Sequence, residues 1–183
     1  ALAHGHVSIE GFEIEHVIED IQSLNQRALR SELEVTAISA HAYAFVADRY
    51  WLLSSGASMG KGYGPILVSK RPVELSDLLG KKIAVPGKLT TASLLLNLYL
   101  NDYKPVEISF DRIIESVQNG EVDAGLLIHE GQITFEKYNL EKIFDLGKVW
   151  EEETGLPLPL GLDVVRADLT EPIARSIAKA LRE

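Results

Sequence analysis

The sequence predicts an α/β fold divided into two lobes, the first of which is discontinuous in the chain. Segments with the two-residue period of a strand alternate with segments of helical period, an order typical of α/β folds with largely parallel strands. A glycine-rich stretch at residues 54–65 and a proline-rich one at residues 156–161 interrupt this order. Because these two crossings delimit the middle of the chain, we expect lobe one over residues 1–65 and 160–183 and lobe two over residues 66–159.

Lobe one is predicted to contain a strand–helix–strand unit. Residues 11–17 have a strand pattern, Ile21, Leu24 and Ala28 follow at helical spacing, and residues 34–38 alternate again. Residues 172–181 return to this lobe as an amphipathic helix, with Thr170 as its candidate N-cap.

Lobe two is predicted to begin with an apolar strand at residues 66–69, directly after the glycine-rich loop. A strand at residues 81–85, a helix from about residue 90 to residue 100, and a strand at residues 106–110 follow. A helix carrying Ile113, Ile114 and Val117 then leads to a strand at residues 124–128. These alternating elements indicate a second α/β unit.

The two lobes contain segments of nearly the same length in which the same elements follow in the same order. A helix from Asp20 leads to a strand that ends at Ser39, and a helix from Asp111 leads to a strand that ends at His129. Ligands bind beyond the carboxyl ends of parallel strands, so the pair could direct Ser39 and His129 toward one shared cleft. Any two strand–helix–strand units resemble each other, however, and the pattern alone leaves both interpretations open.

Composition excludes several classes of function. The chain has 183 residues, 46% of them hydrophobic, and a formal net charge of −9, which suits one or two domains with a core and disfavours nucleic acid as a main partner. The absence of cysteine excludes disulfides, thiolate nucleophiles and iron–sulfur clusters. The longest nearly apolar stretch, residues 92–100, is far below the roughly 20 residues that span a bilayer. The chain as given also opens without a signal peptide.

The sequence contains parts of a phosphate-binding loop and of a zinc-binding motif, but each lacks a residue that the motif requires. Gly62 stands where a P-loop needs Ser or Thr, and the glycine spacing is not that of a dinucleotide-binding loop. His129 begins like a zincin motif, but Ile133 occupies the place of the second histidine. We interpret His4 and His6 as surface histidines. We therefore expect no cofactor and no metal.

Two local features suit chemistry on a small acidic molecule. His129 is the first polar residue after an apolar strand, a position for a general base as well as for a structural histidine. A tight turn before Thr90 opens a helix, whose first N–H groups and dipole suit a carboxylate. N-capping by Thr90 is the simpler alternative for this turn.

Four motifs in this order look like those of 1,4-dihydroxy-6-naphthoate synthases: VPGKLTTA at residues 85–92, FDRI at 110–113, NGEVDAGLLIHE at 119–130 and TGLPLPLG at 154–161. The resemblance implies a two-lobed periplasmic-binding-protein-like type II fold with a cleft between the lobes. It also implies a cytoplasmic lyase of the futalosine route to menaquinone, which converts cyclic dehypoxanthinylfutalosine to 1,4-dihydroxy-6-naphthoate and a three-carbon fragment without a cofactor.

The resemblance assigns His129 as the catalytic base. Ser39, Thr91 and Ala92 match positions that line the family's ligand cleft, and Thr90 lies beside them. The implied partner is a small carboxylated substrate, with no nucleic acid and no membrane span, and a homodimer is compatible with the family.

This chain departs from the family in three respects. Leu89 replaces a histidine of some relatives. The resemblance also leads us to expect a first strand before Ala1 and further helices after Glu183, which the sequence as given does not include. We therefore expect this chain alone to expose apolar surface and to be inactive or poorly folded.

Two alternatives share the expected fold. One is a non-catalytic solute-binding protein that feeds a transporter, and the other is the related chorismate dehydratase. The Thr90-Thr91 turn and the Ile128-His129-Glu130 strand end favour the naphthoate synthase.

Overall fold

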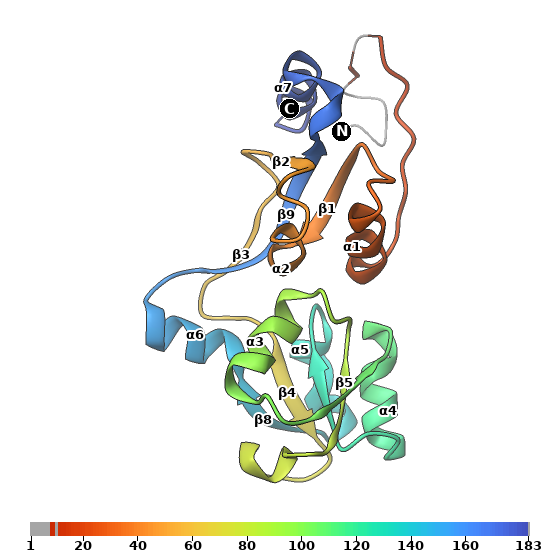
Figure 1. Cartoon of the computed structure of the whole chain (residues 1–183). Coiled ribbons are helices and arrows are strands. Elements are labelled where there is room, and N and C mark those ends of the chain that lie inside the picture. The colour runs from red at the N-terminus through yellow and green to blue at the C-terminus, as the bar shows by residue number, and fades with distance from the viewer. Residues whose placement is uncertain (1–7, 10, 183) are drawn as a thin grey trace. The chain divides into compact units, whose positions relative to one another are not determined.

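The computed structural model describes residues 8, 9 and 11–182, which form two compact units (Figure 1). The first unit comprises Ala1–Ser58 and Gly161–Glu183, and the second comprises Met59–Leu160. The division between the two units falls at residues 58/59 and 160/161, whereas the sequence-based boundaries are at residues 65/66 and 159/160. Each unit has its own sheet.

The first unit contains an antiparallel sheet in which the strand from the C-terminal part of the chain is central. β9 (Leu158–Arg166) lies between β1 (Val35–Ser39) and β2 (Tyr50–Leu52), and β3 (Ser58–Gly60) also pairs with β9. Both β1 and β2 run antiparallel to β9. The prediction of largely parallel pairing is therefore wrong for this unit.

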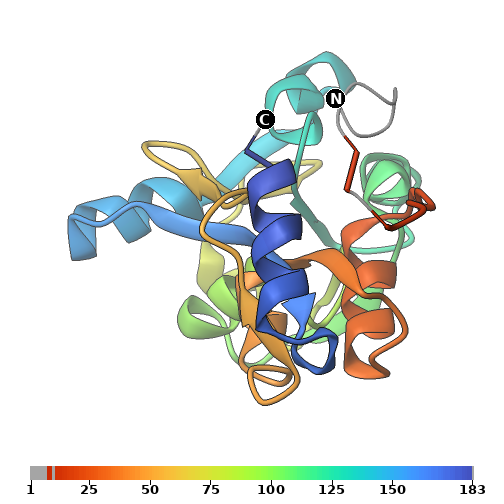
Figure 2. The same cartoon turned by 90° about the horizontal axis from the view of Figure 1, so that it is seen from above.

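Helices of the first unit pack on this sheet (Figure 2). α1 (Ile21–Leu29) contacts β1, and α2 (Ala40–Tyr43) follows β1 directly. α7 (Glu171–Ala180) packs through Ala174 against the buried Val165 of β9, after the short 3-10 helix η5 (Ala167–Leu169). The predicted helices at these two places are thus present.

One predicted strand of the first unit is wrong, and one predicted N-cap is correct in position but lacks the side-chain hydrogen bond of a cap. Residues 11–17 form no strand, because this stretch is exposed and pairs with no strand of the described chain. Thr170 occupies the N-cap position of α7, but its side chain makes no capping hydrogen bond and its φ is 69°.

The second unit contains a mixed sheet in the order β6-β5-β7-β4-β8. These strands are β4 (Ile66–Ser69), β5 (Lys82–Val85), β6 (Lys104–Glu107), β7 (Ala124–Leu127) and β8 (Glu141–Asp145). β5 runs parallel to β6 and β7, whereas β4 runs antiparallel to β7 and β8. The carboxyl ends of β6, β5 and β7 therefore meet at one edge of the sheet.

Alternating strand residues build a core on each face of this sheet. Leu67 of β4 and Leu126 of β7 join one cluster, which includes Leu95 of α3 (Thr91–Tyr99). Val68 and Leu127 join the other cluster, which the helix α4 (Ile113–Asn119) covers. The unit is therefore a three-layered α/β arrangement.

Short helices complete the second unit. They are η2 (Leu75–Leu78), η3 (Phe110–Arg112), α5 (Gly131–Thr134), η4 (Phe135–Tyr138) and α6 (Leu146–Thr154). The strand predicted at residues 106–110 begins earlier, because β6 is an edge strand that tolerates Pro105, and Phe110 instead opens η3. No helix within the described ranges is long and apolar enough to cross a membrane.

Candidate functional site

Four of the five predicted site residues lie at the edge of the second unit where its three parallel strands end. Thr90 caps α3 after β5, Thr91 and Ala92 open that helix, and His129 follows β7. β5 and β7 are hydrogen-bonded neighbours, with Ile83 opposite Ala124, so their carboxyl ends are adjacent. Parallel α/β sheets bind ligands at such edges.

His129 has an unusual backbone conformation. Its φ is 54°, in the left-handed region that few residues with a side chain adopt. The imidazole is exposed, and its ring contacts Phe110 edge-to-face with ring centroids 5.1 Å apart. Strained backbone of this kind gathers at functional sites, and the exposed ring is placed as a proton acceptor would need to be.

The hydroxyl groups of Thr90 and Thr91 form hydrogen bonds with backbone groups of the protein itself. Thr90 Oγ1 donates to the carbonyl oxygen of Gly87 at 2.7 Å and accepts from the N–H of Ser93 at 3.2 Å. Thr91 Oγ1 donates to the carbonyl oxygen of Leu160 at 2.9 Å. Thr90 is therefore a true N-cap, and any anion held here would rely on backbone N–H groups such as that of Ala92, which has no acceptor within the helix.

Ser39, the fifth predicted residue, lies in the first unit at the end of β1. It is 2% exposed and forms a reciprocal pair with Asn25 of α1, which is fully buried. Asn25 Nδ2 donates to Ser39 Oγ at 3.0 Å, and Ser39 N–H donates to Asn25 Oδ1 at 2.8 Å. Because the hydroxyl accepts the Asn25 bond, its own proton stays available for donation.

Local structure supports the internal correspondence between the two segments. In each, a helix leads to a strand, α1 to β1 and α4 to β7, and a four-residue helix follows, α2 or α5. The match is not exact: Ser39 is the last residue of β1 and the N-cap of α2, whereas β7 ends at Leu127 and His129 follows it by two positions, before α5.

Sequence reasoning missed three residues around these positions. They are Asn25, which holds Ser39; Phe110, which contacts the His129 ring; and Gln132, which follows His129 by three positions. Asn25 could have been found as a polar residue between the apolar positions Leu24 and Ala28 of α1. Phe110 lies in the FDRI motif, which pointed to the family but not to a contact with His129, and Gln132 carries no such signal.

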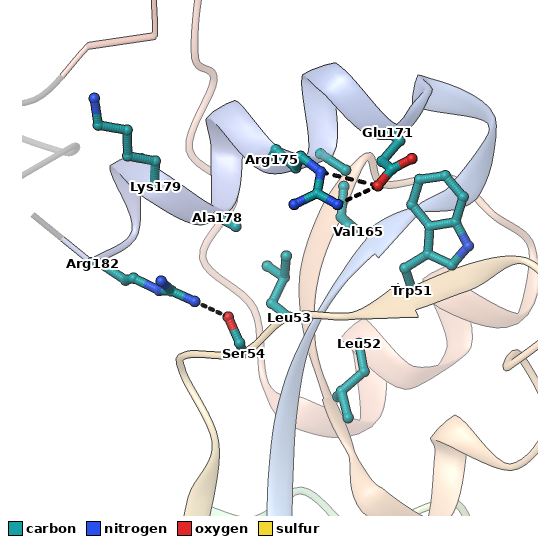
Figure 3. A pocket seen from close by; sticks show the side chains of 11 residues that line it. Trp51, Leu52, Leu53, Ser54, Val165, Glu171, Arg175, Ala178, Lys179 and Arg182 are labelled. Carbon is teal, nitrogen blue, oxygen red and sulfur yellow. Dashed lines mark hydrogen bonds and ion pairs between the residues drawn. The ribbon is translucent and has the colours of Figure 1, made fainter.

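A separate groove of about 600 Å³ lies in the first unit between β2, β9 and α7 (Figure 3). Apolar side chains such as those of Trp51, Leu52 and Ala178 line it. Arg175, paired with Glu171, also lines it. Trp51 and Leu52 are 41% and 50% exposed. None of the five predicted site residues lines this groove.

Other sequence-based expectations concern metals and Leu89. Within residues 8, 9 and 11–182, no group of three or more histidine or carboxylate side chains could hold a metal ion. His4 and His6 lie outside the described residues. Leu89 is half-buried in the turn before Thr90.

The chain matches known proteins over its whole length. A family model described as menaquinone biosynthesis matches residues 1–183. Two similar curated proteins are named 1,4-dihydroxy-6-naphthoate synthase: one from Thermus thermophilus, 47% identical over 182 residues, and one from Streptomyces coelicolor, 38% identical over 188 residues. This chain is covered completely in both alignments but spans 66% of each relative's length.

Solved structures show the same fold. A crystal structure of an Archaeoglobus fulgidus protein is 54% identical, with a TM-score of 0.92, and the match covers 99% of this chain and 67% of that one. The alkanesulfonate-binding protein of Xanthomonas axonopodis pv. citri is 16% identical, with a TM-score of 0.66, over 88% of this chain and 58% of its own. The expected α/β fold like that of periplasmic binding proteins is thereby confirmed.

Proposed function

We propose, starting from the fact that this chain belongs to the menaquinone biosynthesis family, that it provides the catalytic base of a 1,4-dihydroxy-6-naphthoate synthase. The proposed enzyme is a lyase that converts cyclic dehypoxanthinylfutalosine to 1,4-dihydroxy-6-naphthoate. The observation that carries this proposal is the 47% identity to the Thermus thermophilus protein of that name over the whole of this chain.

His129 is proposed to remove one proton from the substrate as the three-carbon fragment leaves. Neutral imidazole is a suitable base near neutral pH, and aromatisation of the product drives the reaction forward. The exposed ring, held edge-on to Phe110 at the end of β7, supports this role.

The first turn of α3 is proposed to hold the substrate carboxylate. Thr90 caps this turn, and the N–H of Ala92 and the helix dipole favour a negative charge. Because β5 and β7 are neighbours, a carboxylate held here would fix the reacting carbon relative to the imidazole. Ser39, with its hydroxyl oriented by Asn25, is proposed as a further substrate-binding residue.

A product assay tests this function. The chain, expressed with any further sequence that its gene encodes, is incubated with cyclic dehypoxanthinylfutalosine, and the products are identified by mass spectrometry. We expect 1,4-dihydroxy-6-naphthoate. Binding without turnover would instead indicate a solute-binding protein, and dehydration of chorismate in a parallel reaction would indicate the dehydratase.

A further inference from the structure

We propose that Gln132 is a positioning residue, which holds the backbone of His129 in its left-handed conformation and thereby places the imidazole. This inference rests on the proposed role of His129 as a base. Its structural part concerns only residues of the second unit and can be tested without a substrate.

The register of the sheet shows what is unusual at His129. β4 and β7 pair antiparallel with Ile66 opposite Leu127, so two further steps would bring Gly64 opposite His129. β7 instead ends at Leu127, and His129 has a φ of 54° rather than the roughly −140° of an antiparallel strand. The antiparallel ladder between β4 and β7 therefore does not extend to Gly64 and His129.

The Gln132 side chain fills the interrupted position. With its amide oriented to satisfy both neighbours, Gln132 donates to the carbonyl oxygen of Gly64 at 2.8 Å and accepts from the N–H of His129 at 3.2 Å. The backbone N–H of Gln132 also donates to the carbonyl oxygen of His129 at 3.2 Å. A carboxamide has the same donor and acceptor as a peptide group, so Gln132 replaces one ladder step between the two backbones.

Gly64 is a fixed anchor for this bridge. It is buried, and a Cβ added to it would lie 2.6 Å from the Cα of Gly147 and 2.9 Å from Cδ2 of Leu158. The neighbouring Pro65 accepts a backbone hydrogen bond from Leu146 at 3.0 Å. Because the backbone of Gly64 packs closely against Gly147 and Leu158, we expect the bond to its carbonyl oxygen to hold the Gln132 amide in place.

Loss of the bridge should release His129. A residue with a side chain disfavours positive φ, so without the Gln132 amide we expect His129 to relax to a negative φ and its imidazole to move. A shift of about 1 Å in a catalytic group can lower turnover by up to about a hundredfold. Substrate binding at α3 does not involve this bridge.

The test compares Gln132→Met with Gln118→Met. Methionine preserves the length of the side chain without its amide. Gln118 is an exposed glutamine whose Nε2 donates to the carbonyl oxygen of Tyr138 at 3.0 Å, so its replacement removes a similar bond away from His129. For Gln132→Met we expect a negative φ at His129 in a crystal structure and a fall in kcat of at least about tenfold with KM nearly unchanged. Gln118→Met should behave as wild type.

A measurement on the unaltered protein keeps the inference falsifiable if Gln132→Met does not fold. The His129 N–H should exchange with solvent slowly, because Gln132 accepts its hydrogen bond. Exchange at the rate of an unprotected amide, or a Gln132→Met variant that retains both the positive φ and full kcat, would overturn the inference. Absence of turnover by the wild type would overturn the proposed function, while exchange and φ would still decide the role of Gln132.

Discussion

Replacement of Asn25 by alanine should destabilise the first unit by about 2–4 kcal/mol. Asn25 is fully buried and makes two hydrogen bonds with Ser39, which is itself 2% exposed. The alanine variant leaves the Ser39 N–H buried without its acceptor, at about 1–3 kcal/mol, and removes a second bond of about 1 kcal/mol.

The assay is urea unfolding followed by the fluorescence of Trp51 in a Trp150→Phe background. The two tryptophans divide between the units, so this background leaves the reporter in the first unit. Gln26→Ala is the matched control, because it removes an exposed amide from the same helix and should change stability by less than about 0.5 kcal/mol.

A double-mutant cycle separates the pair from the rest of the helix. Ser39→Ala retains the Ser39 N–H bond but leaves the Asn25 amide without its acceptor, so we expect a loss of about 1–2 kcal/mol. Asn25→Ala with Ser39→Ala should lose less than the sum of the single variants, by about 1 kcal/mol. Strict additivity, or an Asn25→Ala loss no larger than that of Gln26→Ala, would refute the reasoning.

Three further predictions concern stability. Burial raises the pKa of Asp163, so the folded state binds the proton of this carboxyl more tightly than the unfolded state does. The free energy of unfolding should therefore fall as pH rises above 3.8, the ordinary pKa of an aspartate. Asp163→Asn should remove this contribution to the pH dependence in urea titrations between pH 3 and pH 7, and an unchanged pH dependence would contradict the prediction. Asp20→Ala should cost about 1 kcal/mol in urea unfolding, because it removes the side chain that caps α1, and a loss below about 0.3 kcal/mol would argue against the cap. Gly125→Ala should reduce the free energy of unfolding by about 1–3 kcal/mol and so lower the melting temperature, because the added Cβ would lie 2.6 Å from Cγ2 of Ile113 and 2.8 Å from Cγ2 of Val117. An unchanged melting temperature would show that α4 shifts to accommodate the added methyl group.

The sequence predicted α1, α3, α4 and α7 and every strand of the second sheet except β8, because the apolar periods of these elements are strong and local. It failed where pairing depends on distant partners. Residues 11–17 alternate like a strand but have no strand to pair with in the described structure. β9 was expected only as a proline-rich crossing, yet Pro159 lies outside the register with β1 and β2, so its missing N–H costs no bond in those ladders.

In the candidate site too, the sequence predicted local motifs but not features that depend on pairing between distant strands. The family resemblance, which the family model and the curated relatives confirm, was visible in short motifs that include the turn at Thr90 and the strand end at His129. The left-handed backbone of His129 and its bridge from Gln132 could not be predicted, because they arise from the way β7 ends against β4. The lobe boundaries, the cleft between the lobes and the roles of the site residues stay predictions.

Replacement of His129 by asparagine tests the central claim most directly. Asparagine has a similar size, tolerates positive φ and cannot accept a proton at neutral pH. With cyclic dehypoxanthinylfutalosine as substrate, the variant should retain its melting temperature and its binding but lose turnover by at least about a hundredfold. A stable variant with wild-type turnover would show that another residue is the base, and a variant that melts early with little change in specific activity would show that His129 is structural.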